Sequence, residues 1–118
     1  MATKTLIEYA RLQATKSYIE MATQYGCILV HKGKIVSIGN NKRKGTQSSK
    51  IRDCCYEPNK YTIHAEQDCI RKCPKKIISN CTMILVKITH LDNVAPCDMC
   101  ANLISKYRIK KVLCYSCN

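Results

Sequence analysis

Aromatic side chains are scarce in this sequence, which contains no tryptophan and no phenylalanine. A platform that stacks on a planar ligand would therefore have to be built from the seven tyrosines, the three histidines or arginine planes. Glycine and proline are also few, at 4 and 3 residues. This composition excludes a collagen-like or low-complexity chain, and 118 residues of which 46% are hydrophobic predict a single domain over residues 1–118.

Long apolar runs are missing near the N-terminus. The charged residues that interrupt the first 21 positions are Lys4, Glu8, Arg11, Lys16 and Glu20. We therefore expect no signal peptide and no membrane span there, and place the protein in the cytoplasm. Ten cysteines would indicate disulfides in a secreted chain, but in the cytosol they are expected to be reduced thiols or metal ligands.

Acidic residues are outnumbered, because 8 Asp and Glu stand against 20 Lys and Arg, which gives a formal net charge of +12. A positive field of this size attracts phosphorylated small molecules or nucleic acid. The charge does not distinguish between these partners. Basic side chains that only solvate the surface would give the same count.

Hydrophobic periodicity predicts elements in the order helix, strand, strand, helix, strand, helix, strand. A capping box at Thr5 and Glu8 starts a first helix over about 5–23, and the next two helices begin near His64 and Pro96. The strands are expected at 27–31, 34–39, 81–88 and 112–115. This order favours an α/β fold with three α/β/α layers, in which helices cover both faces of a mixed sheet of about 4–5 strands. The aperiodic segment 40–63 predicts a lid whose Lys and Arg residues could contact a phosphate.

Two short motifs open the second and third helices. They are His64-Ala65-Glu66 and Pro96-Cys97-Asp98-Met99-Cys100. Cys97 and Cys100 are three residues apart and so share one face of a helix. If the two helix starts meet, these two sulfurs and the imidazole of His64 supply three zinc ligands and leave a fourth position for water. A helix N-terminus also favours the thiolate form that zinc requires.

Glu66 follows the candidate ligand His64 by two residues. A carboxylate at this position can reach water and a substrate ring without occupying the metal. We therefore predict that Glu66 is catalytic and carries one proton from water to a ring nitrogen and a second to the departing amine. The reaction predicted is hydrolysis of an exocyclic amine to a carbonyl, with zinc lowering the pKa of the attacking water.

Together the motifs form the signature of zinc deaminases that act on nucleobases. The sequence resembles the cytidine and deoxycytidylate deaminase superfamily from the first helix to the last strand. His64 stands where small nucleoside deaminases usually have Cys, and the runs 61–66 and 96–104 look most like deoxycytidylate (dCMP) deaminases. The resemblance implies a Zn²⁺ cofactor, conversion of dCMP to dUMP and ammonia, and a homo-oligomer.

Three substrate-binding residues follow from this resemblance. Gly39-Asn40-Asn41 matches the family's Gly-x-Asn at the end of the second strand, so Asn41 is expected to hydrogen-bond the sugar. The backbone amide of Ala65 would contact the base. Tyr115 lies near the position of a pocket aromatic in many relatives and would stack on the base, unless it is a core tyrosine.

Other functions stay open on the sequence. A polynucleotide deaminase acting on tRNA adenosine, or on cytidine in single-stranded DNA or RNA, fits the charge of +12. A purely structural zinc site normally has four protein ligands and would give Glu66 no role. The presence of Glu66 also argues against an inactive deaminase fold that only binds nucleic acid or a protein.

The remaining cysteines have two interpretations. Cys114 and Cys117 have ligand-like spacing, and together with Cys27, Cys54 and Cys55 they could hold a second zinc, as in some deoxycytidylate deaminases. Buried cysteines that act as small apolar residues are the alternative.

Overall fold

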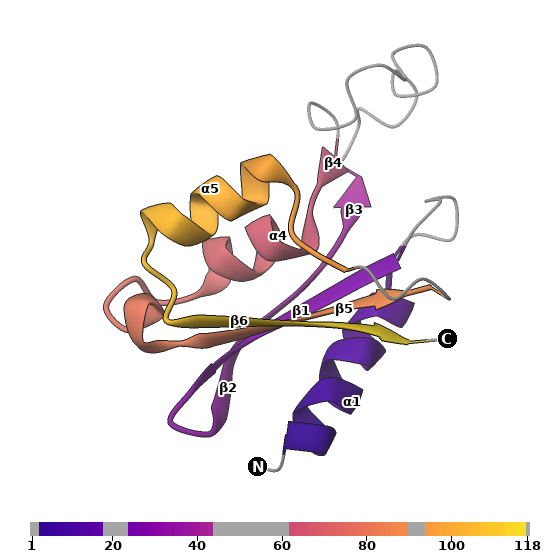
Figure 1. The fold of residues 1–118 in the computed structure, drawn as a ribbon, viewed down its shortest axis with the longest axis horizontal. Coiled ribbons are helices and arrows are strands. Elements are labelled where there is room, and N and C mark those ends of the chain that lie inside the picture. The colour runs from indigo at the N-terminus through magenta and orange to yellow at the C-terminus, as the bar shows by residue number, and fades with distance from the viewer. Residues whose placement is uncertain (1–2, 18–23, 44–61, 90–93, 118) are drawn as a thin grey trace.

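The middle layer of the molecule is a four-stranded mixed sheet (Figure 1). The computed structural model describes residues 3–17, 24–43, 62–89 and 94–117. The strands are β1 (Gln24–His31), β2 (Lys34–Asn40), β5 (Thr82–Ile88) and β6 (Lys111–Cys117), in the order β2-β1-β5-β6. β1 runs antiparallel to both neighbours, whereas β6 runs parallel to β5. The mixed sheet predicted from the sequence is therefore confirmed.

Helices cover both faces of this sheet, as Figure 1 shows. α1 (Thr3–Thr15) packs on one face, and α4 (Ala65–Lys72) and α5 (Asp98–Lys106) lie on the other. Residues of β5 alternate between the two cores: Met83 belongs to the core under α4, and Ile84 to the core under α1. This confirms the three-layer fold. Within the described residues, no helix is both long and apolar enough to cross a membrane.

The hairpin of β1 and β2 turns through only two residues. Lys32 and Gly33 both have positive φ, at 50° and 77°, and His31 pairs with Lys34. Positive φ at both central residues is what a tight hairpin turn needs to match the twist of its strands. The hairpin predicted from the Lys-Gly pair is confirmed, and each strand extends slightly beyond the predicted range.

The first helix differs from its prediction. It begins at Thr3, so Thr5 lies within the helix and is not its N-cap. It ends at Thr15, where the amides of Lys16 and Ser17 bond three residues back and close the last turn. The prediction extended it to residue 23 because apolar residues continue at helical spacing, but residues 18–23 lie outside the described ranges. The buried face consists of Leu6, Ala10, Gln13 and Ala14.

The segment 40–63, predicted to lack regular structure, starts and finishes in a short ribbon. β3 (Lys42–Arg43) pairs antiparallel with β4 (Thr62–Ile63). Since β4 directly precedes His64, this ribbon fixes where α4 begins. Most of the predicted lid, residues 44–61, lies outside the described part of the chain, so the lid stays a prediction. A 3-10 helix, η2 (Ile78–Asn80), connects α4 to β5.

Two glycines allow the helices to approach the sheet closely. A Cβ at Gly39 in β2 would lie 2.5 Å from the carbonyl oxygen of Ala65 and 2.7 Å from the amide nitrogen of Cys69, both in α4. A Cβ at Gly26 in β1 would clash with the backbone of Ala10 and Ala14 in α1. Each glycine thus sets the distance of one helix layer.

The substitution Gly39→Ala is expected to push α4 away from the sheet, lower the free energy of unfolding by about 1–3 kcal/mol, and weaken metal binding. Gly26→Ala is the matched control, because it disturbs α1 on the opposite face. Urea unfolding and zinc titration of both variants test this. Equal zinc affinity in the two variants would show that the position of α4 does not control the metal centre.

Candidate metal centre and active site

The candidate site forms where two helices begin. His64 is the N-cap of α4: its carbonyl accepts from the amide of Asp68 at 2.9 Å, and its own amide donates to Oε1 of Gln67 at 2.9 Å. Cys97 is the N-cap of α5, and its carbonyl accepts from the amide of Ala101 at 2.8 Å. These capping bonds hold the backbone of both residues at the helix starts.

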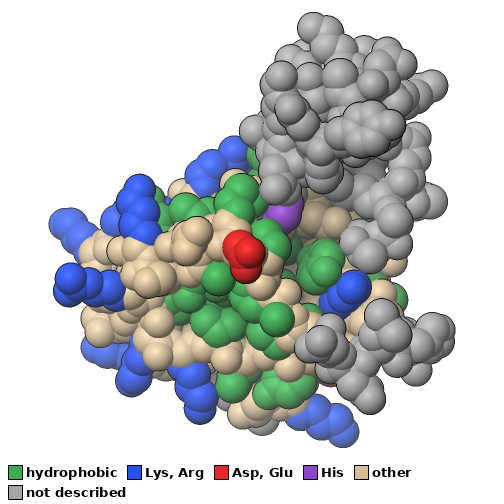
Figure 2. Space-filling view, turned by 45° about the horizontal axis from the view of Figure 1, so that its top comes forward, with side chains coloured by type: hydrophobic (Ala, Val, Ile, Leu, Met, Phe, Trp, Pro, Cys, Tyr) green, Lys and Arg blue, Asp and Glu red, His purple; other side chains and the backbone are tan. Residues whose placement is uncertain are grey.

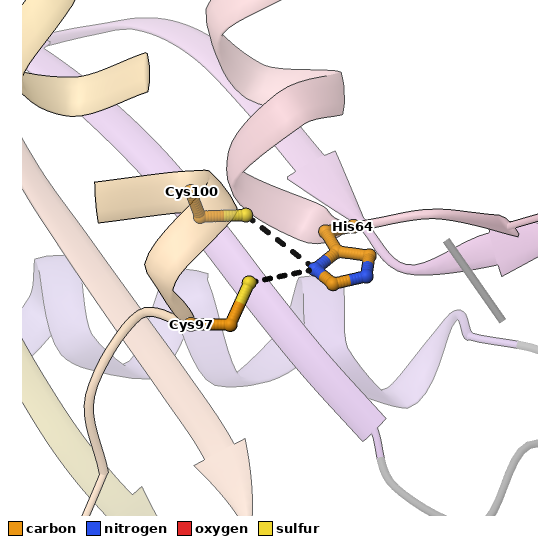
Figure 3. Close-up of side chains that lie close together, drawn as sticks. All are labelled: His64, Cys97 and Cys100. Carbon is orange, nitrogen blue, oxygen red and sulfur yellow. Dashed lines mark hydrogen bonds between the residues drawn. The ribbon is translucent and has the colours of Figure 1, made fainter. Parts of the chain in front are cut away.

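The side chains of these N-caps point toward one another (Figure 3). Sγ of Cys97 lies 3.5 Å, and Sγ of Cys100 3.4 Å, from Nδ1 of His64. In tetrahedral zinc, bonds of about 2.3 Å to sulfur and about 2.0 Å to nitrogen place these atoms about 3.5 Å apart. The spacing and the donor set therefore fit zinc. In the described part of the chain, this is the single group of three or more His, Cys, Asp or Glu residues whose ligand atoms lie within 4.8 Å of one another.

Burial shifts the pKa values of His64 and Cys100 in opposite directions. It lowers the pKa of His64, which favours the neutral imidazole that binds metals. Cys100 is buried, and burial, then the charge of Glu66, raises the pKa of its thiol far above the usual range. Cys97 is exposed. A divalent cation that binds here must release the proton of Cys100, and two thiolates then balance its charge.

Glu66 is buried beside the ligands, with 4% of its surface exposed. Its carboxylate accepts a hydrogen bond from the Cys100 thiol. Burial raises the pKa of Glu66, although bonds from its own backbone amide and from Cys100 partly oppose this. A carboxyl group held next to the ligands with a raised pKa is suited to accept and return protons.

The sequence matches a known protein family over nearly its whole length. The family model described as "Cytidine and deoxycytidylate deaminase zinc-binding region" matches residues 1–116. The chain belongs to this deaminase family. Among curated proteins none matches the sequence.

Solved structures of deaminases share the fold. Guanine deaminase from Bacillus subtilis is 22% identical with a TM-score of 0.65, and 98% of this chain covers 65% of it. The apo dCMP deaminase of cyanophage S-TIM5 is 19% identical with a TM-score of 0.67, and 98% of this chain covers 86% of it. Cytidine deaminase from Burkholderia pseudomallei is 18% identical with a TM-score of 0.67, at 98% and 86% coverage. This chain thus spans less than two thirds of the guanine deaminase.

Two of the predicted substrate-binding residues lie near the candidate ligand His64. Ala65 follows it directly, and Asn41 is brought near it by the pairing of Lys42 with Ile63. Ala65 is the first residue of α4 and is fully buried. Asn41 follows β2 and is buried, and its side-chain oxygen accepts from the amide of Tyr25 at 2.9 Å and from the hydroxyl of Ser17. These bonds orient the Asn41 amide group. The partner Ser17 could not have been found from sequence, because it lies 24 residues from Asn41.

Tyr115 lies on the other face of the sheet. In β6, Cys114 packs in the core under α4 and α5, whereas Leu113 and Tyr115 pack in the core under α1. The structure therefore does not bring Tyr115 to the three ligands. The alternative interpretation, a core tyrosine, agrees with this position.

The alternation of side chains along β6 also separates Cys114 from Cys117, two of the cysteines considered for a second zinc site. Cys114 and Cys117 are an odd number of residues apart in a strand, so their side chains face opposite sides of the sheet. The ligand-like spacing holds for a helix and not for β6. Cys27 is buried in the core beneath α4, and Cys54 and Cys55 lie outside the described residues. The paired site at Cys114 and Cys117 is therefore corrected to two separate thiols.

A groove of about 380 Å³ lies beside α4 and α5. It is lined by Ile63, Gln67, Ile70, Arg71, Lys75, Leu103 and Tyr107. None of the three candidate ligands lines it. The groove is therefore a surface feature that neighbours the metal centre and is distinct from it.

Asp68 is a fully buried carboxylate that belongs to neither of the two motifs. Burial raises its pKa, but hydrogen bonds and charge from Lys42 and Lys72 outweigh this and hold the pKa below its ordinary value of 3.8. A folded-state pKa below the unfolded value stabilises the protein above pH 3.8, and this stabilisation is lost as the pH falls through the lowered value.

We therefore expect the free energy of unfolding to fall more steeply below pH 3.8 in the native sequence than in Asp68→Asn. Urea unfolding at several pH values, with a chelator present so that metal release does not contribute, measures this. Parallel pH profiles would contradict the ion pairing of Asp68.

Proposed function

We propose that this chain is a zinc-dependent hydrolase that deaminates dCMP to dUMP and ammonia. The observation that carries the proposal is the meeting of His64, Cys97 and Cys100 beside the buried carboxylate of Glu66. Family membership supports hydrolytic deamination. The motif resemblance to dCMP deaminases and the fold shared with the cyanophage dCMP deaminase support the choice of dCMP.

His64, Cys97 and Cys100 would hold the zinc. When bound, the ion supplies Lewis-acid activation of water. The carboxylate of Glu66 accepts a proton from the attacking water and delivers it to ring nitrogen N3 while the C4–O bond forms. Glu66 then takes the remaining hydroxyl proton and delivers it to the exocyclic nitrogen. The C4–N bond breaks, ammonia leaves, and a carbonyl remains on the ring.

Substrate orientation is assigned to residues around the start of α4. Asn41 is assigned to the sugar of the substrate, and the bonds that its side-chain oxygen accepts from Tyr25 and Ser17 hold its amide group in place. The backbone amide of Ala65 contacts the base. Burial of Glu66 excludes bulk water from the proton path.

A substrate panel tests this function. Zinc-loaded protein is incubated with dCMP, deoxycytidine, cytidine and guanine, and ammonia release is measured together with the ultraviolet change from cytosine to uracil. We expect turnover with dCMP and a lower kcat/KM for the compounds without phosphate. Absence of ammonia from dCMP, with one zinc bound per chain, would contradict the assignment.

The distribution of charge favours polynucleotide deamination as a second candidate. Eight exposed cations lie where α4 and α5 end and β6 begins: Arg71, Lys72, Lys75, Lys76, Lys106, Arg108, Lys110 and Lys111. Figure 2 shows basic side chains gathered at that end of the molecule. Single-stranded oligonucleotides containing cytidine or adenosine test this candidate. Deamination with binding that weakens steeply with salt supports it, and failure to bind at low salt excludes it.

The proposal includes a homo-oligomer located in the cytoplasm. Light scattering coupled to size-exclusion chromatography tests whether the protein is a homo-oligomer. A mass equal to 13.4 kDa at all concentrations would contradict it.

A further inference from the structure

Asp68 is the centre of a charge cluster on α4. Its side chain has no exposed surface, and it faces three cations: Lys42 at 3.0 Å, Arg71 at 2.9 Å and Lys72 at 3.0 Å. The backbone amide of Asn40 also donates to its Oδ2 at 3.4 Å. A carboxylate this deeply buried is unfavourable unless its oxygens are paired, and these four donors provide the pairing.

The three cations differ in what they connect. Arg71 and Lys72 lie on the same helix as Asp68, at i+3 and i+4, and their side chains are 62% and 44% exposed. Lys42 belongs to β3, and its side chain is 31% exposed. Exposed ion pairs contribute little, and pairs within one helix connect it to nothing else. The pair of Lys42 and Asp68 is therefore the one of the three that ties two separate elements together.

This pair completes a ring of contacts around the start of α4. Along β2, α4 is held by a bond of 2.6 Å from the Ser37 hydroxyl to the Cys69 carbonyl and by close contact at Gly39. Beyond β2 the chain passes through Asn41 to Lys42, whose backbone pairs with Ile63. Ile63 directly precedes the candidate ligand His64.

We propose that Asp68 is a positioning residue, which holds the segment Asn40–Asn41–Lys42 against α4 and thereby sets the affinity for substrate. It acts through Asn41, whose backbone lies between the two residues that Asp68 contacts. The inference rests on the proposed function, because Asn41 is assigned there to the substrate's sugar. It makes Lys42 a structural partner of Asp68 and not a free cation for a phosphate.

The chain supplies its own matched controls. Lys42→Met, Arg71→Met and Lys72→Met each remove one cation from Asp68, but only Lys42→Met breaks the connection to β3. With dCMP as substrate, we expect Lys42→Met and Asp68→Asn to raise KM about tenfold with kcat within about twofold of the native value. Arg71→Met and Lys72→Met should leave KM within about twofold of the native value. A purely stabilising charge cluster would give all three cation variants the same KM.

A second readout does not require activity. Hydrogen exchange of the Asn40 and Asn41 amides, followed by NMR, is expected to accelerate about tenfold in Lys42→Met and not in Lys72→Met. The amide of Ile28 in the central strand β1 serves as the internal control, because global destabilisation would accelerate its exchange as well.

The outcomes separate the two proposals. If the native protein does not deaminate dCMP, the proposed function fails, and the exchange rates alone decide whether Asp68 positions the segment. If Lys42→Met equals Lys72→Met in both KM and exchange, the positioning role is wrong even in an active deaminase. If exchange changes but KM does not, the segment is held by Asp68 without setting substrate affinity, and the proposal is overturned.

Discussion

Replacing Glu66 with glutamine is expected to lower kcat for deamination by about 10²- to 10⁴-fold, the usual contribution of a general acid-base group. Glutamine keeps the size of the side chain but cannot accept a proton from water or return one to the amine. Because the three ligands are retained, the variant should still bind one zinc per chain. Steady-state kinetics with dCMP and zinc analysis of the same samples measure both quantities.

The matched control for this variant is Glu8→Gln, which removes the same charge from an exposed position on α1. It should leave kcat unchanged. Equal activity of Glu66→Gln and the native protein would remove Glu66 from the mechanism. If the native protein and Glu66→Gln both bind zinc but neither is active, the chain is better explained as an inactive deaminase fold.

Local sequence patterns were sufficient to predict the metal centre. The ligands lie in two short motifs at helix starts, and the spacing of Cys97 and Cys100 is itself a helical signal. Bringing His64 to them required only that two helices begin at one place. The order of elements, with strands feeding both helices, predicted this.

The sequence was less informative where one face of a strand had to be chosen. Tyr115 was assigned a role from the family resemblance, and Cys117 from its spacing to Cys114. Alternate residues of a strand face opposite sides of the sheet, and in β6 both of these side chains face α1. Knowing this face requires the register with β5, where Tyr115 pairs with Val86. That pairing is a long-range contact, which periodicity within β6 does not encode.

The charge cluster was missed for a related reason. Arg71 and Lys72 stand at i+3 and i+4 from Asp68, a spacing that predicts helix pairs. Nothing in the spacing indicates that Lys42 completes the cluster, since it lies 26 positions earlier and arrives through the ribbon of β3 and β4. The end of α1 is another case: the helix ends at Thr15, and two residues later the Ser17 hydroxyl bonds Tyr25 and Asn41, which are distant in the sequence and which the apolar pattern of the helix does not reveal.

Removal of one cysteine ligand is expected to abolish both zinc retention and activity. Cys97→Ser and Cys100→Ser should each weaken zinc affinity by at least about 10²-fold, because even outer contacts of a zinc site contribute 10- to 100-fold. Cys97→Ser is the sharper test, since Cys97 is exposed and its loss leaves no cavity in the core. Zinc per chain after dialysis, and ammonia release from dCMP, are the measurements.

The free energy of zinc binding also stabilises the folded chain, so the zinc-bound protein should be more stable than the zinc-free protein. Zinc at about 100 times its dissociation constant stabilises the folded chain by about 2.7 kcal/mol. A chelator should therefore lower the melting temperature of the native protein but not that of Cys97→Ser. Cys81→Ser is the control, because Cys81 is fully buried and its thiol donates to the carbonyl of Ile77, so this variant loses a buried thiol without losing a ligand. The contrary outcome is that Cys97→Ser keeps one zinc and its melting temperature still falls with chelator, while Cys81→Ser loses both properties. The metal would then be bound elsewhere, and the hydrolytic mechanism at Glu66 would lose its basis.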